Sequence, residues 1–153
     1  MVAEREGYEL EIIRADMTKP LPFEDGEFDL IFHPVANCYV EKVEPIFREC
    51  YRVLKPGGVL LGGFGLGLQF AFDEGTGKLE RRLPFNPLLD EKLYEESINS
   101  NSGIQFSHTI EEQLGGQLKA GFILTGIYED TNGYGALQEF NVPDYIATRS
   151  VRP

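Results

Sequence analysis

The sequence predicts one α/β domain, built on a mostly parallel sheet with an antiparallel C-terminal strand. Residues 28–32 (FDLIF) form a nearly continuous apolar run, which is typical of a strand covered on both faces. A stretch with helical apolar spacing follows over residues 41–54, and after Pro56-Gly57-Gly58 a second apolar run occupies residues 59–64. Strand, helix and strand in this order form a βαβ unit, whose two strands are parallel.

Length and charge narrow the class of protein further. A chain of 153 residues suits a single domain over residues 1–153 and can bury a substantial core. The formal net charge of −11 disfavours attraction to nucleic acid or to an anionic membrane surface, so we expect a small-molecule substrate. No apolar run approaches the ~18 residues that a membrane span needs. Two cysteines without a CxxC pair, and no cationic apolar leader, indicate a cytoplasmic protein.

The segment before the first apolar run predicts a strand and a turn. Apolar and polar residues alternate over residues 8–15, which favours a strand that ends at Asp16-Met17. Two prolines in residues 19–23 exclude a helix there, and Asp25-Gly26 supplies a turn.

The helix over residues 41–54 has the clearest pattern in the chain. Pro45 is tolerable because it lies in the first turn, and Glu44 precedes Arg48 by four residues, a favourable ion-pair spacing. The expected buried face consists of Val43, Ile46, Phe47, Cys50 and Leu54.

Residues 66–106 are irregular and predict an inserted cap near the strand ends. Residues 79–85 are expected to pair back on Phe70 and Phe72 as a hairpin. A helix is expected within residues 87–97, with a buried side made of Leu88, Leu89, Leu93 and Tyr94.

Regular structure resumes with a helix over residues 107–120. Thr109 and Glu112 match a capping box, and Gly121 ends the helix. Gly115-Gly116 should cost about 1 kcal/mol each relative to alanine, which predicts a close contact between helix and sheet. The expected inward residues are Ile110, Leu114 and Leu118. Two last strands, over residues 122–129 and 145–150, are expected to be antiparallel neighbours.

Several of these segments resemble the class I S-adenosylmethionine-dependent methyltransferases, in particular the ubiquinone-biosynthesis type of methyltransferase domain. The most characteristic piece is the Leu-x-Pro-Gly-Gly turn that follows the helix. The similar strings are Ala15-Asp16-Met17, Leu21-Pro22-Phe23, Phe28-Asp29-Leu30-Ile31 and the run from Arg48 to Gly58, and the similarity continues through residues 112–122 and 145–149. The resemblance implies a Rossmann-like fold, S-adenosylmethionine as cofactor and methyl transfer to a small molecule.

Part of the family pattern has no counterpart in the chain. In the family, a first strand leads into a Gly-x-Gly-x-Gly loop, and a second strand ends in an acidic residue that binds the ribose. The only comparable string, Gly63-x-Gly65-x-Gly67, follows the wrong strand and leads into no obvious helix. The chain is therefore expected to be a truncated, C-terminal part of such a fold. The alternative to an active methyltransferase is a non-catalytic remnant or an assembly module.

The resemblance assigns roles to a few residues only. Asp16 matches the carboxylate that accepts a hydrogen bond from the adenine amino group, and Met17 would line the ring; the alternative for Asp16 is a turn aspartate that caps the next segment. His33, Pro34 and Asn37 occupy the loop at the methionine end of the cofactor. His33 is the candidate catalytic base because imidazole titrates near neutral pH. Its alternatives are to line the site or only to be hydrogen-bonded, since many methyl transfers depend mainly on alignment.

Other candidate sites are weaker. Cys38 as a nucleophile lacks a second histidine nearby in sequence, and a metal site from His33, His108 and the acidic residues lacks ligand spacing, so no metal is predicted. The acidic pairs of the two later helices are expected on solvated faces. An acceptor pocket or, alternatively, a cap core is expected from Phe70, Phe72, Phe85 and Phe106.

The missing strands predict a bare edge on the strand over residues 28–32. An exposed apolar edge is a template for pairing with further strands. Two arrangements would cover it: residues 8–15 move in to pair with this strand, or a second chain does so in a homodimer.

Overall fold

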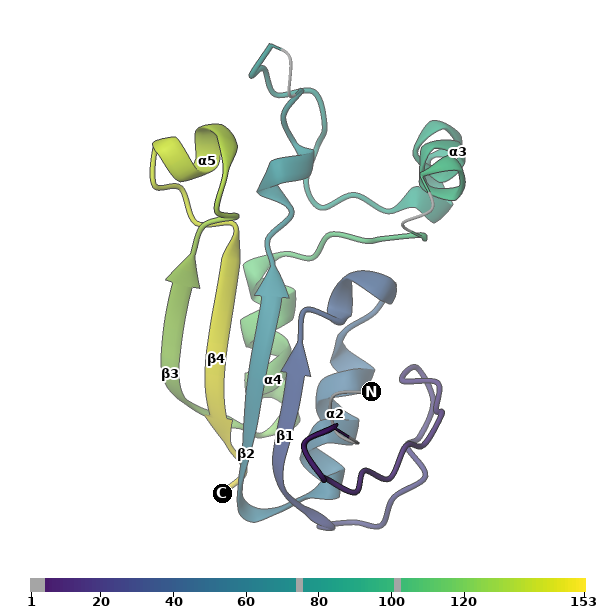
Figure 1. Cartoon of the computed structure of the whole chain (residues 1–153), viewed down its shortest axis with the longest axis vertical. Coiled ribbons are helices and arrows are strands. Elements are labelled where there is room, and N and C mark those ends of the chain that lie inside the picture. Colours follow the sequence, from purple (N-terminus) through teal and green to yellow (C-terminus); the bar gives the residue numbers. More distant parts are fainter. Residues whose placement is uncertain (1–4, 74–75, 101–102) are drawn as a thin grey trace.

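The computed structural model describes residues 5–73, 76–100 and 103–153. Its centre is a four-stranded sheet in the order β1-β2-β4-β3 (Figure 1). β1 (Phe28–Pro34) and β2 (Leu54–Gly65) are parallel, as predicted, and β4 (Tyr145–Val151) is antiparallel to both β2 and β3 (Ile123–Asp130). Three strands therefore run in one direction and the C-terminal strand runs against them. The result is a mixed α/β sheet, a partial version of the Rossmann-like arrangement.

Helix α2 (Glu44–Val53) connects the two parallel strands and confirms the predicted helix in shorter form. Pro45 lies in the first turn, where its missing N–H leaves no hydrogen bond unmade. The expected ion pair joins Arg48 Nη1 and Glu44 Oε1 at 2.7 Å. All five residues of the expected inner face are buried: Val43, Ile46, Phe47, Cys50 and Leu54.

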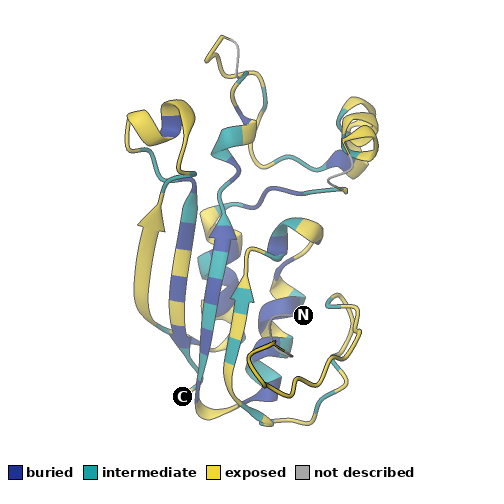
Figure 2. Cartoon of the chain, in the orientation of Figure 1, coloured by how far each residue is buried: buried dark blue, intermediate teal, exposed yellow. Residues whose placement is uncertain are grey.

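The core lies between one face of the sheet and the helices α2 and α4 (Gly116–Ala120), which run behind the strands in Figure 1. Phe47 of α2 meets Phe64 of β2 edge to face, with ring centroids 5.8 Å apart. The expectation that β1 is covered on both faces is wrong. Leu30 and Phe32 are 54% and 73% exposed, and much of β1 is coloured as exposed in Figure 2, because the structure places no second layer over that face.

Residues 8–15 form no strand, which corrects the prediction from their alternation. All residues from 5 to 16 are exposed, including Tyr8, Leu10 and Ile12. A strand needs a neighbour for its backbone hydrogen bonds and a surface to cover one of its faces. This segment finds neither, so it also does not move in to pair with β1, and that expected arrangement is wrong.

The 66–106 segment leaves the end of β2 and rises above the sheet (Figure 1). After a 3₁₀ turn (Leu68–Phe70), an isolated antiparallel bridge joins Phe72 and Leu79, the expected hairpin in minimal form. A second 3₁₀ turn (Pro87–Leu89) leads into α3 (Glu91–Asn99), where Asp90 accepts a hydrogen bond from Leu93 N–H. The expected buried side is wrong, since Leu88, Leu89 and Tyr94 are exposed. α3 lies away from the sheet and therefore has no large apolar surface to pack on.

The capping box before α4 is confirmed in both directions. Glu112 N–H donates to Thr109 Oγ1 at 3.0 Å, and Thr109 N–H donates to Glu112 Oε2 at 2.8 Å. A π-helical turn (Glu111–Gly115) then leads into α4, and Gly121 ends the helix with a φ of 105°. A short helix, α5 (Gly135–Glu139), lies between β3 and β4.

The inner face of this last helical segment differs from the prediction. Ile110 and Leu118 are 55% and 57% exposed, whereas Gln113, Gly116 and Gln117 are buried. Gly116 does permit a close contact, but with a helix: a Cβ there would lie 2.8 Å from Phe47 Cδ2 of α2. Leu114 packs against the core as expected, and the small Gly116 lets α4 approach α2 closely.

Candidate functional site

The carboxyl end of β1 carries a chain of buried polar side chains. His33, near the end of β1, lies with Nε2 2.7 Å from Asn37 Oδ1, and Asn37 is 1% exposed. Asn37 Nδ2 in turn donates to Gln113 Oε1 at 2.7 Å. Because the Asn37 amide gives its N–H to Gln113, its oxygen faces His33 and accepts. His33 Nε2 therefore carries the proton, and Nδ1 keeps its lone pair.

The turn between β1 and this asparagine is tightly constrained. Val35 has a φ of 45°, a left-handed conformation that is costly for a β-branched residue. Val35 N–H nevertheless donates to Gly63 O of β2 at 2.8 Å, which holds the bend. The 3₁₀ turn η1 (Asn37–Tyr39) follows directly. Strain of this kind persists where surrounding contacts over-determine the backbone, as they do here.

A second histidine fixes the same turn from the opposite side. His108 is 6% exposed, and its Nε2 lies 3.0 Å from both Asn37 O and Val40 O. Carbonyl oxygens only accept, so this Nε2 carries the proton. Phe106 N–H also donates to Cys38 O at 2.7 Å. The end of the 66–106 segment is thus bonded to the turn that holds His33.

Beside β1 lies an apolar cavity of about 360 Å³, bounded by the N-terminal segment, β1 and α2. Met17 and His33, which are far apart in sequence, both line it. The remaining lining residues are mostly apolar: Leu21, Phe23, Phe28, Leu30, Ile31, Ala36, Ile46, Glu49, Cys50 and Val53.

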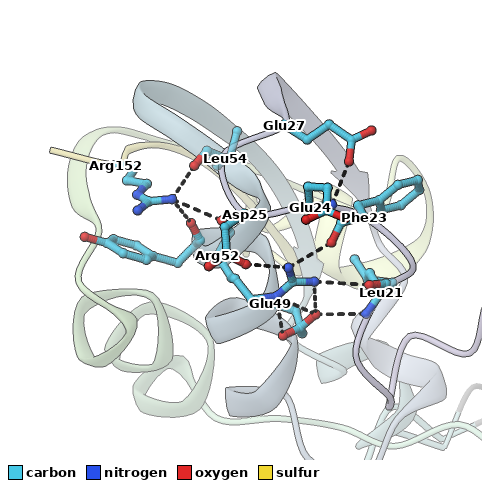
Figure 3. Close-up of polar contacts among 10 residues, drawn as sticks. Leu21, Phe23, Glu24, Asp25, Glu27, Glu49, Arg52, Leu54 and Arg152 are labelled. Atoms are coloured by element: carbon cyan, nitrogen blue, oxygen red, sulfur yellow. Dashed lines mark hydrogen bonds and ion pairs between the residues drawn. The ribbon is translucent and has the colours of Figure 1, made fainter.

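An arginine on α2 holds the N-terminal segment against this cavity (Figure 3). Arg52 Nη1 donates to Phe23 O at 2.8 Å and Nη2 to Leu21 O at 3.1 Å. Glu49 binds both partners: it accepts from Arg52 Nη2 at 2.9 Å and from Leu21 N–H at 2.8 Å. The hydrogen bonds from Arg52, more than any other cause, hold the pKa of Glu49 below its usual value. Sequence reasoning missed this anchor, which brings Met17 to the cavity wall.

Asp16 lies at the surface next to the cavity-lining Met17. Its Oδ1 accepts from Thr18 Oγ1 at 2.7 Å and from Thr18 N–H at 2.9 Å, and these two bonds lower the pKa of Asp16. This is the geometry of the turn aspartate that was the alternative interpretation. The hydrogen bonds given above engage Oδ1, and the adenine role of Asp16 stays a prediction. Pro34 is exposed at the tip of β1.

The other candidates have structural explanations. The Cys38 thiol donates to Val35 O at 3.3 Å, and burial raises its pKa, which lowers its nucleophilicity. Gly63 and Gly65 belong to β2 and Gly67 begins a 3₁₀ turn, so this string is no strand-loop-helix cofactor loop. Within the described ranges, no group of three or more His, Cys, Asp or Glu residues is arranged to hold a metal ion.

Two buried glutamines complete the polar chain, and sequence reasoning missed both. Gln117 Nε2 donates to Gln113 O at 3.0 Å, and Gln117 Oε1 accepts from Thr148 Oγ1 at 3.1 Å and Ser150 Oγ at 2.6 Å. The chain of contacts therefore runs from His33 to the hydroxyls of β4. The spacing of Gln113 and Gln117, four residues apart beside Gly116, is the only sequence signal for it.

Comparisons with known proteins identify the class. A family model described as a methyltransferase domain matches residues 1–62. An uncharacterized methyltransferase of Bacillus subtilis (strain 168), YbaJ, is 39% identical over 159 aligned residues, which cover 99% of this chain and 62% of YbaJ. The chain is therefore similar to methyltransferases over almost its whole length, and it spans less than two thirds of the length of YbaJ.

More distant matches agree with this class. Sterol methyltransferase-like 1 of Botryococcus braunii is 34% identical over 120 residues, covering 76% of this chain and 26% of that protein. The crystal structure of an S-adenosylmethionine-dependent methyltransferase from Mesorhizobium loti matches with a TM-score of 0.68 and 18% identity, over 99% of this chain and 76% of that one. This last likeness shows the shared fold.

No helix in the described part of the chain has both the length and the apolar character of a membrane span.

Proposed function

We propose that this domain takes part in methyl transfer from S-adenosylmethionine to a small molecule, with His33 as the base. The observation that carries the proposal is the pair of hydrogen bonds that runs from the half-buried His33 to the buried Asn37 and on to Gln113. It fixes the imidazole ring and leaves the Nδ1 lone pair at the carboxyl end of β1, the edge at which open α/β sheets bind ligands.

The residues present fit one end of the cofactor. Met17 and Ala36 line an apolar cavity of about 360 Å³, which suits the flat face of an adenine ring, and Asp16 precedes Met17 with a carboxylate able to accept from the exocyclic amino group. Among the described residues, no strand-loop-helix glycine string is present for the methionine end. His33, Pro34 and Asn37 are the residues that we assign to that end.

The chemistry requires one electrophile and one proton acceptor. S-adenosylmethionine, when bound, supplies a methyl group on a positively charged sulfur. In our proposal the acceptor's nucleophilic atom would take this methyl group and leave S-adenosylhomocysteine, and His33 Nδ1 would take the proton that the nucleophile loses. Asn37 holds the ring and stabilises its protonated form by accepting from Nε2. The net charge of −11 supports an acceptor that is small and not a nucleic acid.

Calorimetric titration with S-adenosylhomocysteine tests the proposal. Binding to the full chain is expected, and Asp16→Ala is expected to weaken it by roughly 10-fold, the effect of one hydrogen bond to a charged group. Thr18→Ala is the matched control: it removes the hydroxyl contact to Asp16, and it keeps the backbone contact and the carboxylate. If Thr18→Ala weakens binding as much as Asp16→Ala does, Asp16 acts only through the turn.

Absence of binding at millimolar ligand would reject the donor site in this chain. The alternative, a non-catalytic remnant or assembly module, would then be the better description.

A further inference from the structure

The loop between β3 and β4 contains the single Asn-Gly step of the sequence, Asn132-Gly133. It lies before the short helix α5, at the end of β3 (Figure 1). Asn132 is half-buried, and Gly133 and Tyr134 are exposed. Gly133 has a φ of 80°, a left-handed conformation that favours glycine. Because glycine has no side chain, its backbone nitrogen can be approached more closely than that of any other residue.

The Asn132 side chain folds back over the backbone that follows it. Its Oδ1 accepts from Tyr134 N–H at 3.4 Å, the pattern of an Asx turn. Gly133 lies between these two bonded groups, so the side-chain carbonyl is held over the Gly133 peptide nitrogen. A donor aimed at a carbonyl oxygen also stabilises the negative charge that develops there when a nucleophile adds to the carbon.

The Gly133 nitrogen is only weakly held. Its N–H donates to Thr131 Oγ1 at 3.4 Å, which is long for a hydrogen bond of this type. Little free energy is therefore lost when this nitrogen gives up its proton and turns toward the Asn132 carbonyl carbon.

We propose that Asn132 is a site of spontaneous deamidation. Solvent base removes the Gly133 N–H proton, and the nitrogen forms a bond to Asn132 Cγ. The bond from Cγ to the side-chain nitrogen then breaks, and this nitrogen takes up a proton and leaves as ammonia. Water opens the resulting five-membered succinimide at either carbonyl and gives aspartate or isoaspartate. Each event adds one negative charge to a chain whose formal charge is already −11.

Two other asparagines are protected from this reaction. Asn86 precedes Pro87, whose nitrogen carries no proton to lose. Asn37 is 1% exposed, and its amide is hydrogen-bonded at both ends, to His33 and to Gln113.

Two exposed asparagines, Asn99 and Asn141, are protected by the residue that follows each of them. Ser100 N–H donates to a carbonyl oxygen of α3 at 3.1 Å, and Val142 N–H donates to one of α5 at 2.7 Å. Both nitrogens are therefore held more firmly than that of Gly133, and the branched Val142 side chain also crowds the approach. Asn101 lies outside the described residues.

Peptide mapping by mass spectrometry, after incubation of the full chain at pH 7 and pH 9, tests the site. The Asn132 peptide is expected to convert about 10-fold faster or more than the Asn99 and Asn141 peptides, which needs only a small difference in activation free energy. Conversion should be faster at pH 9, because the attacking nitrogen must lose its proton. An unmodified Asn132, faster conversion at Asn99, Asn101 or Asn141, or a rate that does not rise with pH would overturn the proposal.

Variants and a trapping reagent give independent tests. Ion-exchange chromatography should show a new acidic species in the aged chain, and Asn132→Gln should abolish it because the longer side chain forms a larger, less favourable ring. Asn99→Gln is the matched control and should leave the species unchanged. Hydroxylamine opens a succinimide and should cleave the folded chain after Asn132. An acidic species that persists in Asn132→Gln, or a folded chain that hydroxylamine leaves intact, would refute the site. These measurements need no cofactor and are independent of the proposed methyl transfer.

Discussion

The adjacent glycines of the last helical segment should respond to alanine in opposite directions. Gly115 and Gly116 both have helical backbone angles, so alanine fits either position and removes the conformational penalty of glycine, a gain of about 1 kcal/mol. At Gly115 a new Cβ would meet only Glu111 Cγ at 3.6 Å, an ordinary contact. At Gly116 it would lie 2.8 Å and 3.0 Å from two ring atoms of Phe47, which is fully buried.

Phe47 is fully buried, so Gly116→Ala must displace either its ring or α4 within the packed core. Such overpacking costs about 1–3 kcal/mol, more than the helix gains. We expect Gly115→Ala to be the more stable variant by about 2 kcal/mol, which corresponds to roughly 4–8 °C in melting temperature for a chain of this size. Urea and thermal unfolding followed by circular dichroism measure both.

A double variant sharpens this test. Phe47→Leu removes the ring that the Cβ of Gly116→Ala would contact. The loss in free energy of unfolding caused by Phe47→Leu should therefore be smaller by ~1 kcal/mol in the Gly116→Ala background than in the wild type. Equal stability of the two alanine variants, or additive effects in the double variant, would refute the proposed contact between α4 and α2.

Three further predictions concern the interior and the anchor. Gln117→Leu should lower the free energy of unfolding by about 1–3 kcal/mol, because two buried hydroxyls of β4 lose their shared acceptor; chemical denaturation would show no change if those hydroxyls were already solvated. Glu49 has a lowered pKa when folded, so it stabilises the fold above its unfolded value of 4.5 and this contribution is lost as the pH falls through its folded pKa. Glu49→Gln should therefore be less stable than the wild type at pH 7, with the difference closing in acid; a constant difference would contradict this linkage. Burial raises the pKa of Cys50 to about 12, so iodoacetamide should label it only after unfolding, and rapid labelling of the folded chain at pH 8 would show that it is not buried.

The parts of the fold that depend on apolar spacing were predictable from sequence. α2 presents to the core the five apolar residues that its period selects, and β1 and β2 pair in parallel as the βαβ order requires. The capping box of Thr109 and Glu112 was equally readable, since it is local and depends on two side chains three residues apart.

The parts that depend on neighbours were not predictable. Residues 8–15 alternate as a strand does, but a strand also needs a neighbour for its backbone hydrogen bonds, and the described part of the chain places none beside this segment. From the sequence alone, Gln113 and Gln117 would be placed on the surface. A buried glutamine whose amide is fully hydrogen-bonded cannot be distinguished in a sequence from an exposed one. The same limit applies to the candidate site. The position of His33 at a strand end could be predicted from the sequence, but its hydrogen bond to Asn37, and that of Asn37 to Gln113, could be found only from the structure.

The 66–106 segment is fastened at both ends, and this has a consequence for engineering. At its start, the buried Asp144 accepts from Leu68 N–H at 2.6 Å; at its finish, Phe106 is bonded to Cys38. The stretch between these two hydrogen-bonded ends rises away from the sheet. Its length can therefore be changed, or a foreign loop inserted into it, with little effect on the strands of the sheet. A change of one residue beside Phe106 would instead affect the turn that follows β1 and holds His33.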